Sequence, residues 1–345
     1  MNIWKHMRIQ KNGGMQKMGL FEELSAKIRG KGKRIVFPEG HDVRVLGAVI
    51  RLKNEDLIDP ILVGNPAEIE KAAQELGQSI EGMNIIDPEN YDQFEEMVAS
   101  FVGRRKGKAT PEQAQQILKD KMYFATMLVY QDIAEGLVAG ATQSTGATVK
   151  PALQIIKTRQ GVTSTSGVFI MVPPNENDQK LVFGDGAINI NPTAEQLAEI
   201  AIESAKTARI FDIEPRVALL SFSTKGSASS PEVDKVVEAT KLAKELAPEL
   251  SLDGELQFDA AISEHVGEKK APGSPVAGKT TVFIFPEIQS GNIGYKIAQR
   301  LGGYQALGPI LQGMAKPITD LSRGCNEEDV YKLSIITANQ ALIQD

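Results

Sequence analysis

The sequence predicts an α/β fold, because short apolar runs alternate along the chain with longer segments whose apolar residues recur at helical spacing. Most of the short runs are apolar on both faces, which is typical of buried parallel strands. The chain has 345 residues and a hydrophobic content of 42%, enough for a sizeable core and about two domains. These observations indicate a globular protein with mostly parallel sheets.

The strand candidates are apolar runs of the length that strands usually have. They are KRIVFP at 33–38, PILVG at 60–64, GLVAGA at 136–141, GVFIMV at 167–172, KLVFGD at 180–185, RVALLSF at 216–222 and TVFIFP at 281–286. Because few polar residues interrupt them, we expect these runs to lie inside the sheets.

Helices are predicted where a capping residue precedes a periodic segment. An amphipathic helix is expected to begin the folded body at Met18, after an N-terminal extension of residues 1–17. Three later helix starts share a capping oxygen, at Thr110, Thr193 and Ser230. The first two are followed three residues later by Gln, which can close a capping box. The final helix is expected to run from Asn326 to about Leu342.

Cysteine usage and charge exclude several classes of protein. Cys325 is the single cysteine, so an internal disulfide framework is excluded and a cytoplasmic location is expected. The three histidines lack zinc-ligand spacing with it, so no metal site is expected. No secretory signal and no run of about 18 apolar residues is found, so no membrane partner is expected. The net charge of -6 argues against nucleic acid as a partner.

Four polar, glycine-bearing loops lie between a predicted strand and a predicted helix, where main-chain N–H groups and the helix dipole favour anions. They are QSTGATVK at 143–150, SFSTKGSASSP at 221–231, PEIQSGNIGYK at 286–296 and DLSRGCNEED at 320–329. None has the spacing of a nucleotide-binding motif, so nucleotide hydrolysis and dinucleotide binding are not supported. Each loop alone is also explained as a capped turn, because Ser, Thr and Gly are common at helix starts.

The loop at 320–329 is the most unusual of the four, because Ser322 and Arg323 stand together immediately before a helix. Arg323 offers a forked donor for a phosphate or a developing oxyanion, although a surface arginine near a turn is the alternative. If Asn326 is the cap, Asp329 is the third helical residue, where an acid complements the dipole. Residue types alone therefore favour a structural role for Asp329.

Several long segments resemble the phosphate acetyl/butyryltransferase family. The segment from AAISEHVGEKKAPGSP to DLSRGC, at 260–325, is similar to the signature region of phosphate acetyltransferases. FPEGHDVRVL, GLVAGATQSTGATVKPALQIIKT and ALLSFSTKGSA match family segments in the same order, so the likeness extends from Met18 to Asp345. The activity implied is reversible transfer of acetyl between coenzyme A and inorganic phosphate.

The resemblance also implies an architecture and a set of partners. It implies two α/β domains around a cleft, with mostly parallel sheets and helices on both faces, as in isocitrate and isopropylmalate dehydrogenases. Domain I would span 18–160 and regain the C-terminal segment 316–345, and domain II would span 161–315. A homodimer is expected, with coenzyme A, acetyl-CoA, acetyl phosphate and phosphate as substrates and no permanently bound cofactor.

Residue by residue, the matching catalytic group is Ser322, Arg323 and Asp329, which replaces the structural interpretation of Asp329. Arg104 in GRRKGK matches a substrate-contacting arginine, with Arg105 beside it as the other possible register. The remaining candidate substrate-binding residues lie in the loops: Ser144, Thr145, Gly146, Lys150, Ser223, Lys225, Asn292, Tyr295 and Lys296.

Two positions depart from the family pattern. Lys150 stands where the family often has arginine, so a point charge replaces a bidentate fork. The segment 184–187 lacks the cysteine that some members carry there. A mechanism for this chain therefore cannot depend on that cysteine.

The chemistry needs a thiolate, and Asp329 alone is a weak base for it. An unperturbed thiol and aspartate differ by about 4.6 pKa units, so proton transfer is uphill by roughly 6 kcal/mol. We expect burial to raise the pKa of Asp329 during the reaction while nearby cations stabilise the thiolate. Two rival interpretations remain: a phosphate butyryltransferase, and a catalytically silent module that binds coenzyme A or acetyl phosphate.

Overall fold

The structure is a computed structural model that describes residues 9–11, 14–16, 19–175 and 178–343. The chain divides into two compact units: unit 1 comprises Met1–Ser144 and Leu321–Asp345, and unit 2 comprises Thr145–Asp320. The domain boundaries expected from the sequence differ from this division and stay a prediction. In the predicted N-terminal extension, the described residues form two short antiparallel strands, β1 (Ile9–Lys11) and β2 (Gly14–Gln16). The rest of that extension, and Met18, lie outside the described residues.

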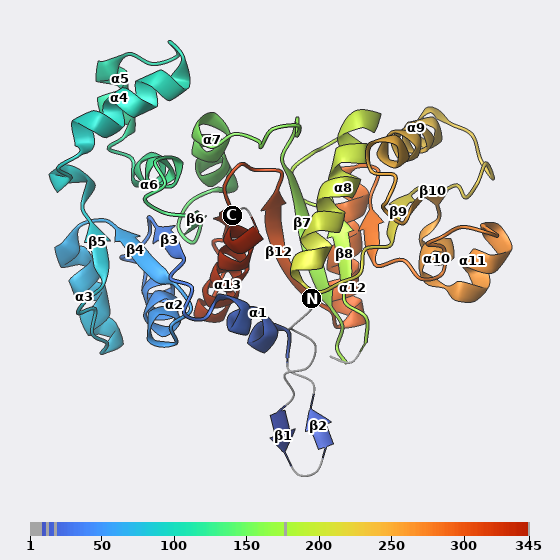
Figure 1. The fold of residues 1–345 in the computed structure, drawn as a ribbon, viewed down its shortest axis with the longest axis horizontal. Coiled ribbons are helices and arrows are strands. Elements are labelled where there is room, and N and C mark those ends of the chain that lie inside the picture. Colours follow the sequence, from blue (N-terminus) through green and yellow to red (C-terminus); the bar gives the residue numbers. More distant parts are fainter. Residues whose placement is uncertain (1–8, 12–13, 17–18, 176–177, 344–345) are drawn as a thin grey trace. The chain divides into compact units, whose positions relative to one another are not determined.

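Unit 1 is built on a four-stranded parallel sheet in the order β6-β3-β4-β5 (Figure 1). Its strands are β3 (Arg34–Phe37), β4 (Asp59–Val63), β5 (Asn84–Ile86) and β6 (Gly136–Ala139). In the centre of the sheet, Val36 pairs with Ile61 on one side and Leu137 on the other. The three predicted strands of this unit are therefore confirmed as buried parallel strands.

Helices surround this sheet. They are α1 (Leu20–Ile28), α2 (Val43–Asn54), α3 (Pro66–Leu76), α4 (Phe94–Arg105), α5 (Pro111–Ile117), α6 (Lys121–Tyr130) and α13 (Glu327–Ile343), with a short 3-10 turn at Pro88–Asn90. Helix α13 packs on α1, α2, β3 and β6, and most of its length is buried. The Asn339 amide donates to the Leu24 carbonyl oxygen at 3.1 Å, which fixes α13 to α1.

Unit 2 contains a mixed sheet in the order β10-β9-β11-β8-β7-β12-β13. The strands are β7 (Ser166–Val172), β8 (Leu181–Gly184), β9 (Val217–Leu220), β10 (Leu252–Leu256), β11 (Val282–Ile284), β12 (Gln305–Gln312) and β13 (Ile318–Asp320). Strands β8 to β11 are parallel, whereas β7 is antiparallel to both β8 and β12. A strand that is apolar on both faces is predicted to be buried, but its direction in the sheet is not predicted. The antiparallel direction of β7 therefore did not follow from the sequence.

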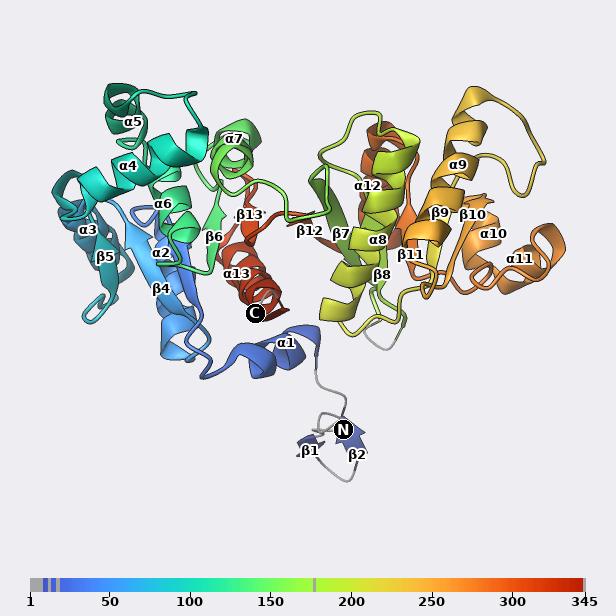
Figure 2. The ribbon, with the colours of Figure 1, turned by 45° about the horizontal axis from the view of Figure 1, so that its top comes forward.

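Helices cover both faces of the unit 2 sheet (Figure 2). They are α7 (Thr145–Ile155), α8 (Ala194–Ile210), α9 (Pro231–Leu246), α10 (Phe258–Ile262), α11 (Glu264–Lys270) and α12 (Ile288–Gly302). On β7, Val168 lies toward α8, next to Ile200 and Ser204, whereas Phe169 packs with Tyr295 of α12. Because neighbouring side chains of a strand point to opposite faces, α8 and α12 cover opposite faces.

The predicted helix caps are confirmed. Thr110 and Thr193 each accept a hydrogen bond from the main-chain N–H three residues on, and Gln113 and Gln196 close the two capping boxes. The Ser230 side chain caps α9. The start of α1 at Leu20 and the extent of α13 agree with the prediction within two residues.

Besides β1 and β2, four strands were not predicted. Strands β10 and β12 contain charged or Gly-Pro residues that do not resemble an apolar run, and β5 and β13 have three residues each. In β10 the carboxylates of Asp253 and Glu255 are buried because lysine, hydroxyl and main-chain donors bind them.

Helix α12 begins at Ile288, so most of the predicted loop at 286–296 is helical. Its glycines suggested a loop, but Gly291 serves close packing against the segment that follows β8. A Cβ atom at position 291 would lie 2.4 Å from the main-chain oxygen of Asp185. Hence only glycine allows the helix to approach this closely.

No helix within the described residues has both the length and the apolar character needed to cross a membrane.

Candidate active site

The segment between β13 and α13 forms a tight turn that presents the predicted catalytic pair. The N–H of Cys325 donates to the carbonyl oxygen of Ser322 at 2.9 Å, and the N–H of Gly324 donates to the Ser322 hydroxyl at 3.2 Å. The side chains of Ser322 and Arg323 are exposed, whereas Cys325 is buried. Within the described part of the chain, the Arg323 guanidinium has no hydrogen-bond or ion-pair partner. The turn therefore exposes a hydroxyl group and a forked donor on two consecutive residues.

Asp329 lies one helical turn beyond this pair and takes part in a reciprocal cap. Its N–H donates to the Asn326 side-chain oxygen at 2.9 Å, and its carboxylate accepts the Asn326 N–H at 3.0 Å. Asn326 is therefore the cap that the residue types predicted, and Asp329 closes a capping box with it. The catalytic role of Asp329 that the resemblance implies stays a prediction.

A buried carboxylate shapes the turn that follows β6, and the sequence did not single it out. Glu39 is 3% exposed, and its oxygens accept the N–H groups of Gly140, Ala141 and Thr142 at 2.7–2.9 Å. The Thr142 hydroxyl donates to the same carboxylate at 2.6 Å. Glu39 therefore fixes the main chain that leads to Ser144. The sequence feature that could have pointed to Glu39 is its position directly after the predicted strand at 33–38.

Arg44, in the first turn of α2, contacts both of these turns and was also missed. Its guanidinium donates to the carbonyl oxygens of Arg323, Cys325 and Ala141 at 2.9–3.0 Å. It also forms a bidentate pair with Asp42, which caps α2. In unit 1 the structure thus brings together the turn after β6 and the turn before α13, with Arg44 between them.

Arg104 lies in the last turn of α4, apart from these turns, with its guanidinium 4.9 Å from the ring centre of Tyr130. A cation over an aromatic face is held in place without losing its charge. Arg105 is adjacent on the same helical turn, and both side chains are partly exposed. Both registers named for the family arginine therefore lie at the end of α4.

The predicted loop at 143–150 is mostly the beginning of α7. Thr145 and Gly146 are its first two residues, and Lys150 lies one turn further on. Ser144, Thr145, Gly146 and Lys150 are all exposed. The start of a helix is a favourable place for an anion, because N–H groups of the first turn have no intrahelical acceptor.

Ser223 and Lys225 bind groups of unit 2 itself. The buried Ser223 hydroxyl donates to Glu255 at 3.0 Å, and the N–H of Gly226 donates to the same oxygen at 2.7 Å. The Lys225 ammonium contacts Asp253 at 2.7 Å. These side chains therefore hold the loop at 221–230 against β10.

The buried acid Asp253 gives a prediction on pH. Burial alone would raise its pKa, but hydrogen bonds from Lys225 and Lys244 outweigh it and lower the pKa to about 2. A depressed pKa contributes stability that is present above the unfolded-state value of 3.8 and is lost as the pH falls towards 2. We expect Asp253→Asn to be less stable than the parent protein near neutral pH, and we expect this difference to shrink in acid.

Urea unfolding of both proteins between about pH 6 and pH 3 measures that difference. Asp259→Asn is the matched control, because Asp259 also pairs with a lysine but its side chain is 54% exposed. A stability difference for Asp253→Asn that is constant over this range would contradict the assignment.

Asn292, Tyr295 and Lys296 lie together on α12. The Asn292 amide donates to the carbonyl oxygen of Gly186 at 3.1 Å and accepts from Lys296 at 2.8 Å. Tyr295 stacks on Phe169 with ring centres 3.9 Å apart, and burial raises the pKa of Tyr295. The structure therefore places these three predicted residues on one side of a helix, next to the segment after β8.

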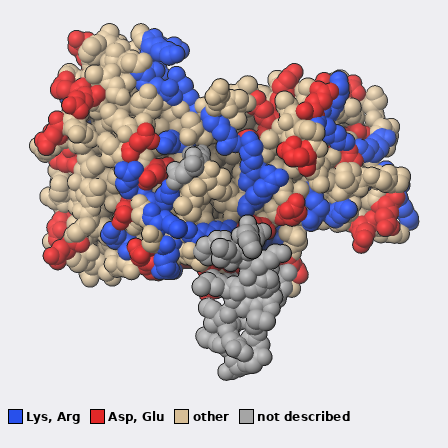
Figure 3. All heavy atoms as spheres, in the orientation of Figure 1, with Lys and Arg blue, Asp and Glu red and all other residues tan. Residues whose placement is uncertain are grey.

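Lys and Arg side chains also cluster at helix α8, which the sequence did not indicate as a binding site. Figure 3 shows Lys and Arg side chains collected over α8, where Lys206 and Arg209 are exposed. Arg159 and Lys206 both pair with the buried carboxylate of Glu203. Burial and the charges of Arg159 and Arg209 lower the pKa of Lys206. Local positive charge is therefore available on a chain whose net charge is -6.

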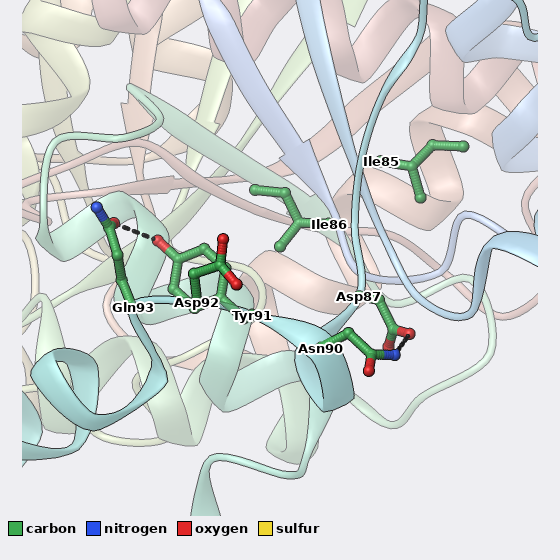
Figure 4. Close-up of a pocket in the computed structure, with 7 residues that line it drawn as sticks. All are labelled: Ile85, Ile86, Asp87, Asn90, Tyr91, Asp92 and Gln93. Atoms are coloured by element: carbon green, nitrogen blue, oxygen red, sulfur yellow. Dashed lines mark hydrogen bonds between the residues drawn. The ribbon is translucent and has the colours of Figure 1, made fainter.

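A cavity of about 270 Å³ in unit 1 lies away from the predicted site (Figure 4). Its lining residues are Ile85, Ile86, Asp87, Asn90, Tyr91, Asp92 and Gln93. Asp87 accepts from Asn90 at 2.7 Å, and the Tyr91 hydroxyl donates to Gln93 at 3.0 Å. Because these polar groups bind one another and no predicted site residue lines the cavity, we assign it no function.

No group of three or more His, Cys, Asp or Glu side chains in the described ranges is arranged to hold a metal ion.

Comparisons with known proteins connect these features to a family. The family model for phosphate acetyl/butaryl transferase matches residues 19–338. The phosphate acetyltransferase of Bacillus subtilis is 58% identical over 94% of this chain and 99% of its own. A phosphotransacetylase structure from Streptococcus pyogenes is 55% identical, with a TM-score of 0.92 over 94% of this chain and 98% of its own. A branched-chain phosphotransacylase from Enterococcus faecalis, 19% identical, covers 90% of this chain and 99% of its own with a TM-score of 0.63, which shows a shared fold. The chain belongs to the phosphate acetyl/butaryl transferase family.

Proposed function

We propose that this protein is a phosphate acetyltransferase, which moves acetyl reversibly between acetyl-CoA and inorganic phosphate to give coenzyme A and acetyl phosphate. The observation that carries the proposal is the turn before α13. Ser322 and Arg323 are exposed there, the Arg323 guanidinium has no partner among the described residues, and Arg44 binds the main-chain carbonyl oxygens of the turn. The high identity to proteins named phosphate acetyltransferase supports it.

In the proposed mechanism, the thiolate of coenzyme A attacks the carbonyl of acetyl phosphate directly within a ternary complex. Ser322 and Arg323 donate hydrogen bonds to the tetrahedral oxyanion, because charge develops there only in the transition state. The C–O bond to phosphate then breaks and phosphate leaves. No acyl-enzyme forms, so acetyl label retained by denatured enzyme would contradict this pathway.

Asp329 is the proposed acceptor of the thiol proton. Its carboxylate accepts one main-chain N–H, that of Asn326. Bound substrate would shield this carboxylate from water, and Arg323 close to the thiol would stabilise the thiolate of coenzyme A. Both effects favour the proton transfer.

The remaining candidates are proposed to bind substrate. Arg104, Lys150 and the N–H groups of residues 144–146 would hold phosphoryl groups, since they combine positive charge with a helix start. Asn292, Tyr295 and Lys296 would contact substrate from α12. Ser223 and Lys225 would act through the shape of their loop, because their polar groups are bound to β10.

Three further features belong to the proposal. Coenzyme A takes part as a substrate, and no cofactor is permanently bound. The active protein is a homodimer. Its location is the cytoplasm, which fits a single reduced cysteine.

A spectrophotometric assay of thiol release from acetyl-CoA tests the proposal directly. Release of coenzyme A is expected to require added phosphate, and acetyl-CoA is expected to react faster than butyryl-CoA. Release that does not depend on phosphate, or no release at all, would sink the assignment. Faster reaction of butyryl-CoA would favour the butyryltransferase instead.

A further inference from the structure

We propose that Arg44 is a positioning residue, which fixes the Ser322-Arg323 turn through its main chain and takes no part in binding substrate. All of its contacts described here lie within unit 1. The inference rests on the proposed function for its kinetic consequence, but the placement of the turn can be measured independently of activity.

The guanidinium of Arg44 has no donor left for a substrate. Nε donates to Asp42 at 3.0 Å, and Nη2 donates to Asp42 at 2.8 Å and to the Ala141 carbonyl oxygen at 2.9 Å. Nη1 donates to the carbonyl oxygens of Arg323 at 3.0 Å and Cys325 at 2.9 Å. Because an arginine carries one N–H on Nε and two on each Nη, every donor is in use. Its role is therefore to hold protein groups in place.

Two of these acceptors belong to the catalytic turn itself. The carbonyl oxygen of Arg323 belongs to the peptide group before Gly324, and that of Cys325 to the peptide group after Cys325, so binding both fixes the orientation of the turn. Ser322 and Arg323 themselves are exposed. The arrangement sets the direction of the reacting groups without occupying them.

The Ala141 carbonyl links the second turn to the first. Glu39 binds the N–H groups of this turn, and Arg44 binds its Ala141 carbonyl, so the main chain before Ser144 is held from both sides. Both turns therefore take their position from one side chain of α2. A loss of this side chain would displace the two predicted parts of the site in unit 1 together.

Asp42 holds the guanidinium of Arg44 in a fixed position. Its carboxylate forms a parallel two-bond pair with Nε and Nη2, a geometry that a guanidinium can adopt and an ammonium cannot. Burial opposes the charge of Asp42, but the hydrogen bonds from Arg44 outweigh it and keep the pKa of Asp42 below its ordinary value. The pair therefore stays charged, and lysine is not an adequate replacement at position 44.

The single cysteine provides a probe of the turn. Cys325 is 6% exposed, its carbonyl oxygen is bound by Arg44, and burial raises the pKa of its thiol. Release of the turn would expose this thiol to a reagent in solution. The rate at which dithiobis(nitrobenzoate) labels the folded protein reports on the turn without any substrate.

The decisive experiment compares Arg44→Lys and Arg44→Gln with Arg51→Gln. Arg51 is the matched control, because it lies two turns later on α2 and binds Glu328 of α13, but it does not touch the turn. Labelling of Cys325 is expected to accelerate by about tenfold in both Arg44 variants and to stay unchanged in Arg51→Gln. Thermal unfolding confirms that each variant is folded. Unchanged labelling in the folded Arg44 variants would overturn the inference, whatever their activity.

Kinetics separate positioning from a general loss of stability. The kcat of Arg44→Lys is expected to fall by about tenfold with little change in KM for either substrate. Combined with Arg323→Ala, it should cost clearly less than in the parent protein, because part of its effect passes through the placement of Arg323. Additive losses, or a KM effect alone, would contradict positioning. If the parent protein does not transfer acetyl, the proposed function is refuted. If labelling of Cys325 is still faster in the Arg44 variants, the positioning role of Arg44 remains supported.

Discussion

Replacement of Arg323 by alanine is expected to reduce kcat by about two to three orders of magnitude, which is the range for one lost oxyanion donor. The guanidinium is exposed and unpaired within the described residues, so its removal leaves no buried group without a partner. The free energy of unfolding should therefore change by less than about 0.5 kcal/mol. Steady-state kinetics and urea unfolding measure the two quantities.

A lysine at the same position refines this prediction. Arg323→Lys keeps the charge but loses the planar fork, so its kcat should fall between those of the parent protein and Arg323→Ala. Arg209→Ala is the control, because Arg209 is an exposed arginine on α8 that the mechanism does not use. Full turnover in Arg323→Ala would remove this residue from the mechanism.

The fold could be predicted well where local chemistry decides the structure. The buried runs at 33–38 and 60–64 became strands because their apolar residues have no other favourable environment, and Thr193 began a helix because its hydroxyl satisfies an N–H there. Strand direction and the acidic strand β10 were not accessible in this way. Asp253 is buried in a strand because Lys225 and Lys244, 28 and 9 positions away in the sequence, pair with it from outside that strand.

The same distinction applies to the residues of the candidate site: some could be predicted from the sequence and others could not. The exposed pair Ser322 and Arg323 is visible in the sequence because it interrupts a strand-to-helix turn with unusual residue types. The roles of Glu39 and Arg44 cannot be predicted from the sequence. These side chains bind main-chain groups about 100 and 280 positions away, which come close to them only in the folded protein. A sequence shows which side chains are available for chemistry more readily than it shows what holds them in place.

Asp329→Asn is expected to lower kcat by about two orders of magnitude, the lower end of the range for a lost general base. The residue has two roles that this substitution separates. An asparagine oxygen still accepts the Asn326 N–H, so the cap at the start of α13 survives. The amide does not accept a proton from a thiol. Stability should therefore stay within about 1 kcal/mol of the parent protein while turnover falls.

The control for Asp329 is a cap that lies outside the proposed chemistry. Thr193→Ala removes the capping box of α8 and should cost about 1 kcal/mol of stability with kcat unchanged, which shows that a lost cap alone does not slow the reaction. If Asp329→Asn keeps its turnover, the carboxylate serves α13 only, and the thiol proton must go to solvent or to phosphate. If turnover falls and recovers at higher pH, where coenzyme A ionises without help, the assignment as base is supported, because a thiolate no longer needs an acceptor.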